Sequence, residues 1–181
     1  MVERLKEEYE VDVEWRPYYL RSDTPSEGME LPDYIKRARA NGSDERLRSI
    51  ANAYGMDFNS TERIYNTRLA HESTEYAREH GKGNEFHKVI FRKVYVDGRD
   101  LSQWDVLCSA AEEVGLNAEE MKSAVESEKY TANVAEQVQW AYQIGVSGVP
   151  TYVINDRYAL VGAQSYEVFK NALVQIMNRK E

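Results

Sequence analysis

A long run of helical segments fills the middle of this chain and leaves little of it for a sheet. From about residue 32 to residue 144, apolar residues recur at helical spacing between glycines, which end helices, and Asn or Ser residues, which cap them. Asn117, for example, precedes a segment that carries Met121 and Val125 on one face. The intervals between these signals have ordinary helix lengths. Strands are therefore confined to the two ends of the chain.

The expected helices follow one another with short connections. One ends at Gly55, and the next is expected to be capped by Asn59 or Ser60, to carry Ile64 and to end at Gly81. Further helices are expected around Phe86–Val94, Val106–Val114 and Met121–Val125, and from Thr131 to Ile144.

The N-terminal end predicts one strand. Residues 2–9 are typical of the end of a helix, and within residues 11–20 apolar side chains then alternate with charged ones. Pro17 has no backbone N–H, so it favours an edge position or a strand end. The alternating residues are Val11, Val13 and Trp15 against Asp12, Glu14 and Arg16.

The C-terminal end predicts a hairpin and a last helix. Residues 150–154 and 158–161 are short apolar runs separated by the turn-forming residues 155–157. Ser165 is expected to begin an amphipathic helix. One strand, a helical block, a hairpin and a helix make an α/β plan with at most three strands in its sheet.

Composition and charge exclude several classes of function. The 181 residues are 42% hydrophobic and 30% charged, as in a soluble globular domain, and no segment resembles a signal peptide or a membrane span. We therefore expect a cytoplasmic protein with no membrane partner. The net charge of −8 would repel phosphate backbones, so no nucleic acid partner is expected either.

Cysteine and histidine offer little chemistry. Cys108 is the single cysteine, which excludes an internal disulfide, and its helical setting is typical of a small buried apolar residue. His71 and His80 are nine residues apart on one expected helix, so they do not share a metal-binding face, and His87 lies on the next helix. No metal and no cofactor is expected.

The C-terminal signature resembles a known family. Residues 145–154, continued by residues 158–164, are similar to the end of DsbA-like thioredoxin domains, above all to the FrnE-like branch of dithiol-disulfide isomerases. More distantly, they are similar to chromene-carboxylate isomerases and kappa-class glutathione transferases. Other stretches agree with the FrnE-like branch in the same order, namely Val13–Tyr18, Leu20–Pro25, Asn66–His71, Ala77–Lys82, Gly98–Leu101 and Ala110–Leu116.

The resemblance implies an architecture and an absence. It implies a single thioredoxin-like domain over residues 1–181, with residues 1–31 and 145–181 as the thioredoxin part and 32–144 as a large helical insertion. The family opens with a strand and a Cys-x-x-Cys motif at the start of its first long helix. This chain begins near the end of that helix, so the first strand and both redox cysteines are expected to be missing. No catalytic residue is therefore assigned.

The other half of the family's site is present. In the resembling proteins the bond that corresponds to Val149–Pro150 is cis, and an extended substrate pairs with the backbone beside it. Gly148, Val149, Pro150 and Thr151 are therefore the predicted substrate-binding residues. The alternative is a proline that merely begins a strand.

Three functions remain open from the sequence. The first is a protein-disulfide oxidoreductase or isomerase, of which this chain is a truncated or inactive form that is itself redox-inactive. The second is a non-catalytic peptide-binding module, and the third is a glutathione-dependent transferase or isomerase. The expected partner is accordingly an extended polypeptide or a small thiol.

The expected absence of the first strand predicts how the remaining strands pair. In the resembling fold it lies between the strand of residues 11–20 and the strand of residues 151–154. The chain is expected either to pair these two strands directly or to fill the gap from a partner, as a homodimer or by a strand swap.

Overall fold

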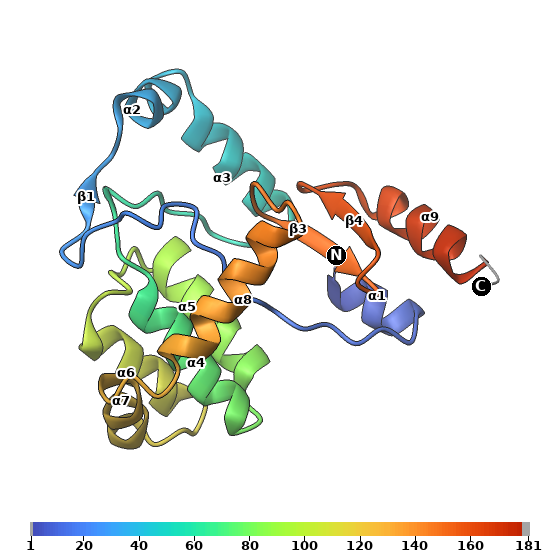
Figure 1. Cartoon of the computed structure of the whole chain (residues 1–181). Coiled ribbons are helices and arrows are strands. Elements are labelled where there is room, and N and C mark those ends of the chain that lie inside the picture. Colours follow the sequence, from blue (N-terminus) through green and yellow to red (C-terminus); the bar gives the residue numbers. More distant parts are fainter. Residues whose placement is uncertain (1, 179–181) are drawn as a thin grey trace. The chain divides into compact units, whose positions relative to one another are not determined.

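A computed structural model describes residues 2–178 and shows an α/β chain rich in helix (Figure 1). The helices are α1 (Val2–Glu8), α2 (Asp33–Ala40), α3 (Ser43–Ala53), α4 (Arg68–Glu79), α5 (Gly83–Tyr95), α6 (Trp104–Glu113), α7 (Ala118–Glu126), α8 (Thr131–Gln143) and α9 (Tyr166–Met177). The strands are β1 (Met29–Glu30), β2 (Arg63–Ile64), β3 (Thr151–Ile154) and β4 (Tyr158–Val161). The expected order of helical block, hairpin and last helix is confirmed.

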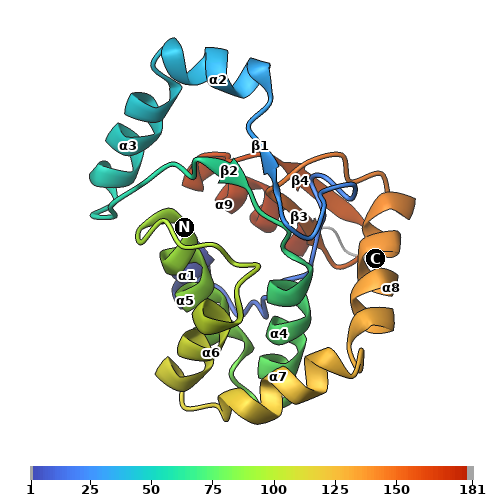
Figure 2. The ribbon, with the colours of Figure 1, turned by 90° about the vertical axis from the view of Figure 1, so that its left-hand side faces the viewer.

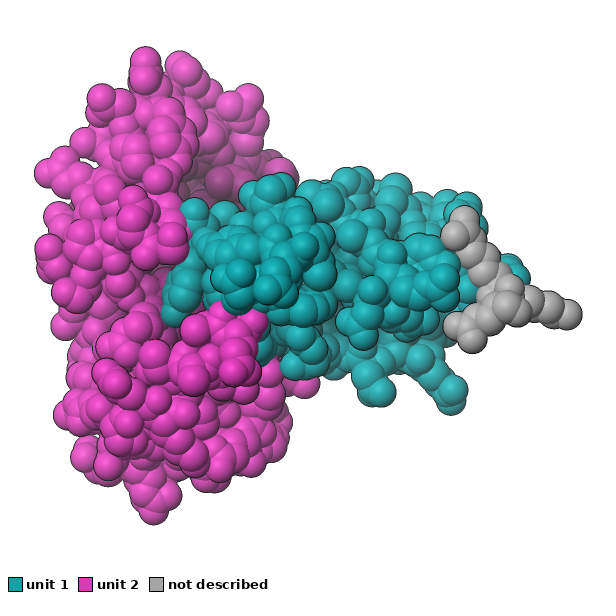
Figure 3. Space-filling model, viewed as in Figure 1, with its two compact units in different colours: residues 1–20, 137–181 teal, residues 21–136 magenta. Residues whose placement is uncertain are grey.

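The chain divides into two compact units (Figure 3). One combines residues 1–20 with residues 137–181, and the other holds residues 21–136. This division comes earlier in the sequence than the predicted boundaries at residues 31 and 145. The prediction of a single domain concerns how the units associate, and it stays a prediction.

A helical core holds the unit of residues 21–136 together. Helices α4, α5, α6 and α7 lie beside one another in both ribbon views (Figures 1 and 2). Phe86, Leu107 and Met121 are completely enclosed between them. Asn117 caps α7 as predicted, because its side-chain oxygen accepts hydrogen bonds from the N–H groups of Glu119 and Glu120, both at 3.1 Å. The burial of apolar side chains and the capped end of α7 therefore both stabilise this unit.

A small ladder replaces the predicted start of α4. Met29 pairs with Ile64 and Glu30 with Arg63, so Ile64 lies in a strand and α4 begins only at Arg68. Gly28 permits this pairing, since it has a φ of 74° and a Cβ there would lie 2.6 Å from the carbonyl oxygen of Ile64. The prediction of a helix capped by Asn59 or Ser60 was therefore wrong.

The hairpin and α9 form the core of the other unit. Strands β3 and β4 are antiparallel and are joined by the three residues 155–157, in which Asn155 and Asp156 have φ values of 50° and 51°. Positive φ values of this kind are typical of tight hairpin turns. The ring of Tyr152 contacts that of Phe169 edge to face at a centroid distance of 4.5 Å. The buried residues around this contact are Leu5, Phe169 and Leu173.

The prediction of a strand within residues 11–20 was wrong. This segment has no ladder partner, and β3 pairs only with β4 among residues 2–178. Val11 and Val13 are partly buried while Asp12 and Glu14 are exposed, so the alternation reports one covered side rather than a neighbouring strand. Direct pairing of this segment with β3 is thereby contradicted, whereas filling of the gap by a partner stays a prediction. Between residues 2 and 178, no helix is both long and apolar enough to span a bilayer.

Candidate functional site

The predicted substrate-binding residues follow the end of α8. Gly145 has a φ of 83°, and its N–H donates to the carbonyl of Tyr142 at 3.0 Å. The N–H of Val146 donates to the carbonyl of Ala141 at 2.9 Å. These two bonds form a Schellman motif, which ends α8 and turns the chain toward β3. The start of the segment that contains residues 148–151 is therefore held in place by the C-terminal end of α8.

Two tyrosines hold the start of this loop. The hydroxyl of Tyr18 donates to the carbonyl of Val146 at 3.2 Å, and its ring meets that of Tyr142 edge to face at 5.4 Å. The hydroxyl of Tyr142 in turn donates to the carbonyl of Tyr19 at 3.1 Å. Neither tyrosine was predicted as a site residue, because both contacts join segments more than 120 residues apart and no local spacing indicates them.

The far side of the loop is fixed by β3 and β4. The hydroxyl of Thr151 donates to the carbonyl of Gly148 at 2.7 Å, and the N–H of Gly162 donates to the carbonyl of Pro150 at 2.8 Å. The carbonyls on either side of Val149 are thus already occupied. The four predicted residues lie together, but Gly148, Pro150 and Thr151 use polar groups to shape the loop.

Val149 differs from its neighbours. Its bond to Pro150 is cis, which confirms the prediction for this bond. Its side chain is 50% exposed, and neither its N–H nor its C=O forms a hydrogen bond with any residue from 2 to 178. An exposed donor, an acceptor and an apolar side chain are therefore offered at one residue. That the four residues contact a substrate stays a prediction.

The chain contains no thiol pair. Cys108 is the one cysteine in the sequence, so no Cys-x-x-Cys motif exists in it. The thiol is partly buried on α6, and this burial, followed by the charge of Glu119, raises its pKa. A raised pKa reduces the thiolate at neutral pH, and the thiolate is the reactive form. The geometry is that of an inert cysteine.

The histidines are structural. Burial lowers the pKa of both His71 and His87 to about 4, with a smaller contribution from the charge of His87 on His71 and of Lys88 on His87. The Nδ1 atom of His80 lies 2.8 Å from the carbonyl oxygen of Tyr76. In the part of the chain that the structure describes, no three His, Cys, Asp or Glu side chains converge as metal ligands.

Comparison with known proteins agrees with this geometry. A model of the DsbA-like thioredoxin domain matches residues 1–174. The chain is 28% identical to the uncharacterized protein YwbO of Bacillus subtilis (strain 168) over 174 residues, which cover 94% of this chain and 85% of the relative.

Two solved structures have a similar fold. A probable DsbA oxidoreductase from Streptomyces coelicolor has a TM-score of 0.82 at 24% identity and covers 92% of this chain and 76% of its own. A 2-hydroxychromene-2-carboxylate isomerase has a TM-score of 0.79 at 17% identity, with 97% of this chain and 86% of its own covered. Since the family model spans nearly all of the sequence, the chain belongs to the DsbA-like thioredoxin family.

Proposed function

We propose that this chain is the substrate-holding part of a cytoplasmic protein-disulfide oxidoreductase or isomerase of the FrnE-like branch, whose redox cysteines are not among the 181 residues. The family assignment supports the reaction class. The observation that carries the proposal is Val149, which is exposed and has an unused backbone donor and acceptor in a loop that is otherwise fixed.

The reaction itself needs groups that this sequence lacks. In thiol–disulfide exchange a thiolate attacks one sulfur of a disulfide, a mixed disulfide forms, and a second thiol resolves it. Cys108 supplies one thiol, its pKa is raised, and no second thiol is present to resolve a mixed disulfide. These 181 residues alone are therefore proposed to be redox-inactive.

Substrate binding requires no thiol. The N–H of Val149 would donate to a carbonyl of an extended polypeptide, and its C=O would accept from an N–H of the same segment, as in strand addition. The exposed Val149 side chain would meet an apolar residue of the substrate. Gly148 and Thr151 would keep the loop in the conformation that offers these groups.

Two measurements test the proposal. In an insulin-reduction assay with dithiothreitol, the chain should not raise the rate above background. A reduced, carboxymethylated polypeptide, which is extended and has blocked thiols, should nevertheless bind, with the amide resonance of Val149 shifting in NMR spectra.

A matched pair of variants locates the binding. Val149 and Val168 are both exposed valines of the same unit, at 50% and 41%, and Val168 lies on α9. Val149→Asp places a charge where an apolar residue should dock and should weaken binding about tenfold or more, whereas Val168→Asp should change it less than about twofold. Equal effects of both substitutions, or no saturable binding, would contradict the proposed role of the loop.

Two other functions share this fold. A non-catalytic peptide-binding module would bind the same probe, but mass spectrometry of the native protein would then find no Cys-x-x-Cys segment. A glutathione-dependent transferase or isomerase is favoured by the structural similarity to 2-hydroxychromene-2-carboxylate isomerase over 97% of this chain. Calorimetry with glutathione would detect it, and an absence of heat would remove it.

The open edge of β3 supports a proposal about assembly. Within residues 2–178, β3 pairs with β4 alone, and a strand edge of this kind is a template for pairing. We propose that a second copy fills it by strand swapping. Light scattering should give twice the chain mass of 20.9 kDa, and a monomer at high concentration would contradict the swap.

A further inference from the structure

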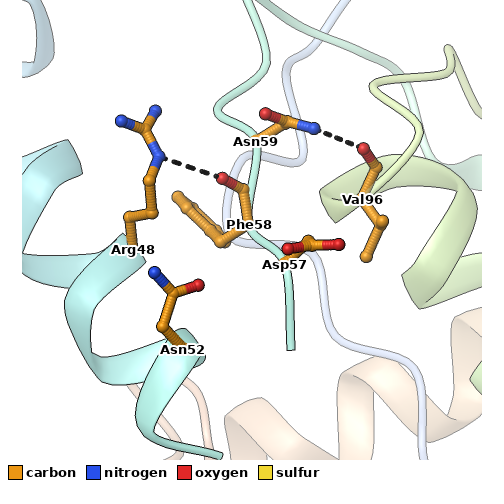
Figure 4. Close-up of a pocket in the computed structure, with 6 residues that line it drawn as sticks. All are labelled: Arg48, Asn52, Asp57, Phe58, Asn59 and Val96. Carbon is orange, nitrogen blue, oxygen red and sulfur yellow. Dashed lines mark hydrogen bonds between the residues drawn. The ribbon is translucent and has the colours of Figure 1, made fainter. Parts of the chain in front are cut away.

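A hollow lies within the unit of residues 21–136. Its volume is about 400 Å³, and its walls come from α3, from residues 57–59 and from the residue after α5 (Figure 4). Arg48 and Asn52 are four residues apart on α3, so their side chains share one face of that helix. The residues lining the hollow are Arg48, Asn52, Asp57, Phe58, Asn59 and Val96.

Contacts between the walls hold the hollow in shape. The N–H of Asn59 donates to the carbonyl of Tyr95 at 2.6 Å, and its side-chain amide donates to the carbonyl of Val96 at 2.5 Å. The ring of Phe58 stacks on that of Tyr95 with an interplanar angle of 16° and a centroid distance of 6.0 Å. On the opposite side, Nε of Arg48 reaches the carbonyl of Phe58 at 3.5 Å. The segment of residues 57–59 is thus tied to α5 and lies against α3.

Two opposite charges at this hollow have no ion-pair partner among residues 2–178, although the Nε of Arg48 donates to the carbonyl of Phe58. Among residues 2–178, neither the guanidinium of Arg48 nor the carboxylate of Asp57 forms an ion pair, and the two do not pair with each other. Asn52 likewise forms no side-chain hydrogen bond to another described residue. Figure 4 shows Arg48 and Asn52 on one side of the hollow and Asp57 on the other. Phe58 and Val96 supply the apolar surface.

We propose that this hollow binds a small zwitterion with an apolar side chain, namely a free α-amino acid. A guanidinium binds a carboxylate in a bidentate manner, and Asp57 would bind the ammonium group of the same molecule. The amides of Asn52 and Asn59 would accept or donate further hydrogen bonds, and the side chain of the ligand would lie against Phe58. A ligand with only one charge would leave either Arg48 or Asp57 unpaired.

The exposure of the polar side chains to water limits the affinity of the hollow for its ligand. All four polar side chains of the hollow are exposed to water, so each ionic contact is weakened by solvent. We therefore expect dissociation constants of about 0.1 to 10 mM. With such values the occupancy of the site would change with the concentration of the amino acid in the cell.

An NMR titration of the full chain tests the site. L-Leucine and L-phenylalanine should shift the side-chain amide resonances of Asn52 and Asn59 in a saturable way. N-acetyl-L-leucine amide has the same side chain but no charge, and it should leave these resonances in place. Arg48→Gln and Asp57→Asn should each weaken L-leucine binding about five- to tenfold, because each removes one ionic contact.

Arg46→Gln is the matched control. Arg46 is an exposed arginine of the same helix that donates to the carbonyl of Asn41 and does not line the hollow. This variant should bind L-leucine within about twofold of the unchanged chain, since long-range charge effects are screened. An absence of saturable shifts, equal binding of the blocked amide, or equal losses in Arg46→Gln and Arg48→Gln would overturn the proposal. None of these readouts involves Val149 or the proposed redox function.

Discussion

Acid should destabilise the helical unit through two histidines. Burial lowers the pKa of His71 and His87 from 6.5 to about 4 in the folded chain, while the unfolded chain keeps the ordinary value. Between about pH 6.5 and pH 4 the unfolded state therefore binds more protons than the folded state. The contribution of the two histidines to the free energy of unfolding is therefore fully present above about pH 6.5, and it is lost as the pH falls through this window.

The size of the effect follows from the two pKa values. At about pH 5 each histidine should cost about 2 kcal/mol of stability, so the pair should cost about 4 kcal/mol relative to about pH 7.5. Carboxylates such as Glu8 and Glu79 have pKa values lowered from 4.5, so their contribution to stability is lost mainly below about pH 5. The loss between pH 7.5 and pH 5 thus belongs to the histidines.

Urea unfolding followed by far-ultraviolet circular dichroism measures this loss. His71→Gln and His87→Gln should each remove about half of the difference between the two pH values, because glutamine stays neutral. An unfolding free energy that is the same at both pH values, or variants that retain the full difference, would refute this reasoning.

Three further results are expected. Glu72 is 1% exposed and accepts hydrogen bonds from Arg68 at 3.0 and 3.1 Å and from the hydroxyl of Thr131 at 2.9 Å, so Arg68→Ala should cost about 2–3 kcal/mol in urea unfolding by removing two hydrogen bonds to this buried carboxyl group, and no loss would contradict this. Leu107 is completely buried and Leu47 is 48% exposed, so Leu107→Ala should cost about 2–5 kcal/mol and Leu47→Ala at most about 0.5 kcal/mol, and equal costs would be inconsistent with this core. Cys108, with its raised pKa, should react with a thiol reagent faster in urea than in the folded chain, and equal rates would show an open thiol.

The elements that the sequence predicted correctly are those specified by nearby residues. Asn117 caps α7 with its own side chain, and Gly145 ends α8 through bonds to the last turn of that helix. The hairpin of β3 and β4 needs only its two short runs and the turn at Asn155 and Asp156. In each case the physical cause lies within a few residues, so the pattern identifies it.

The failures have distant causes. Ile64 has helical spacing, but it pairs with Met29, which is 35 residues away and not recognisable as a partner from spacing. Tyr18 lies in a segment with strand alternation, yet side-chain bonds to the end of α8 fix its position instead of a backbone ladder. Of the residues in the candidate loop, position 149 was found from a family signature, and its free backbone groups became visible only in the structure.

The contacts that shape the loop of residues 148–151, the Val149 loop, come from residues that carry no thiol. Tyr18, Tyr142, Thr151 and Gly162 all belong to the unit of residues 1–20 and 137–181, and no contact among them involves sulfur. The loop therefore takes this conformation in a chain that has no thiol pair. The substrate holding that we propose for this loop would then be separate from thiol exchange, so the insulin assay and the binding of the Val149→Asp variant test different properties. A chain that fails to reduce insulin but binds an extended polypeptide is the outcome that this separation requires.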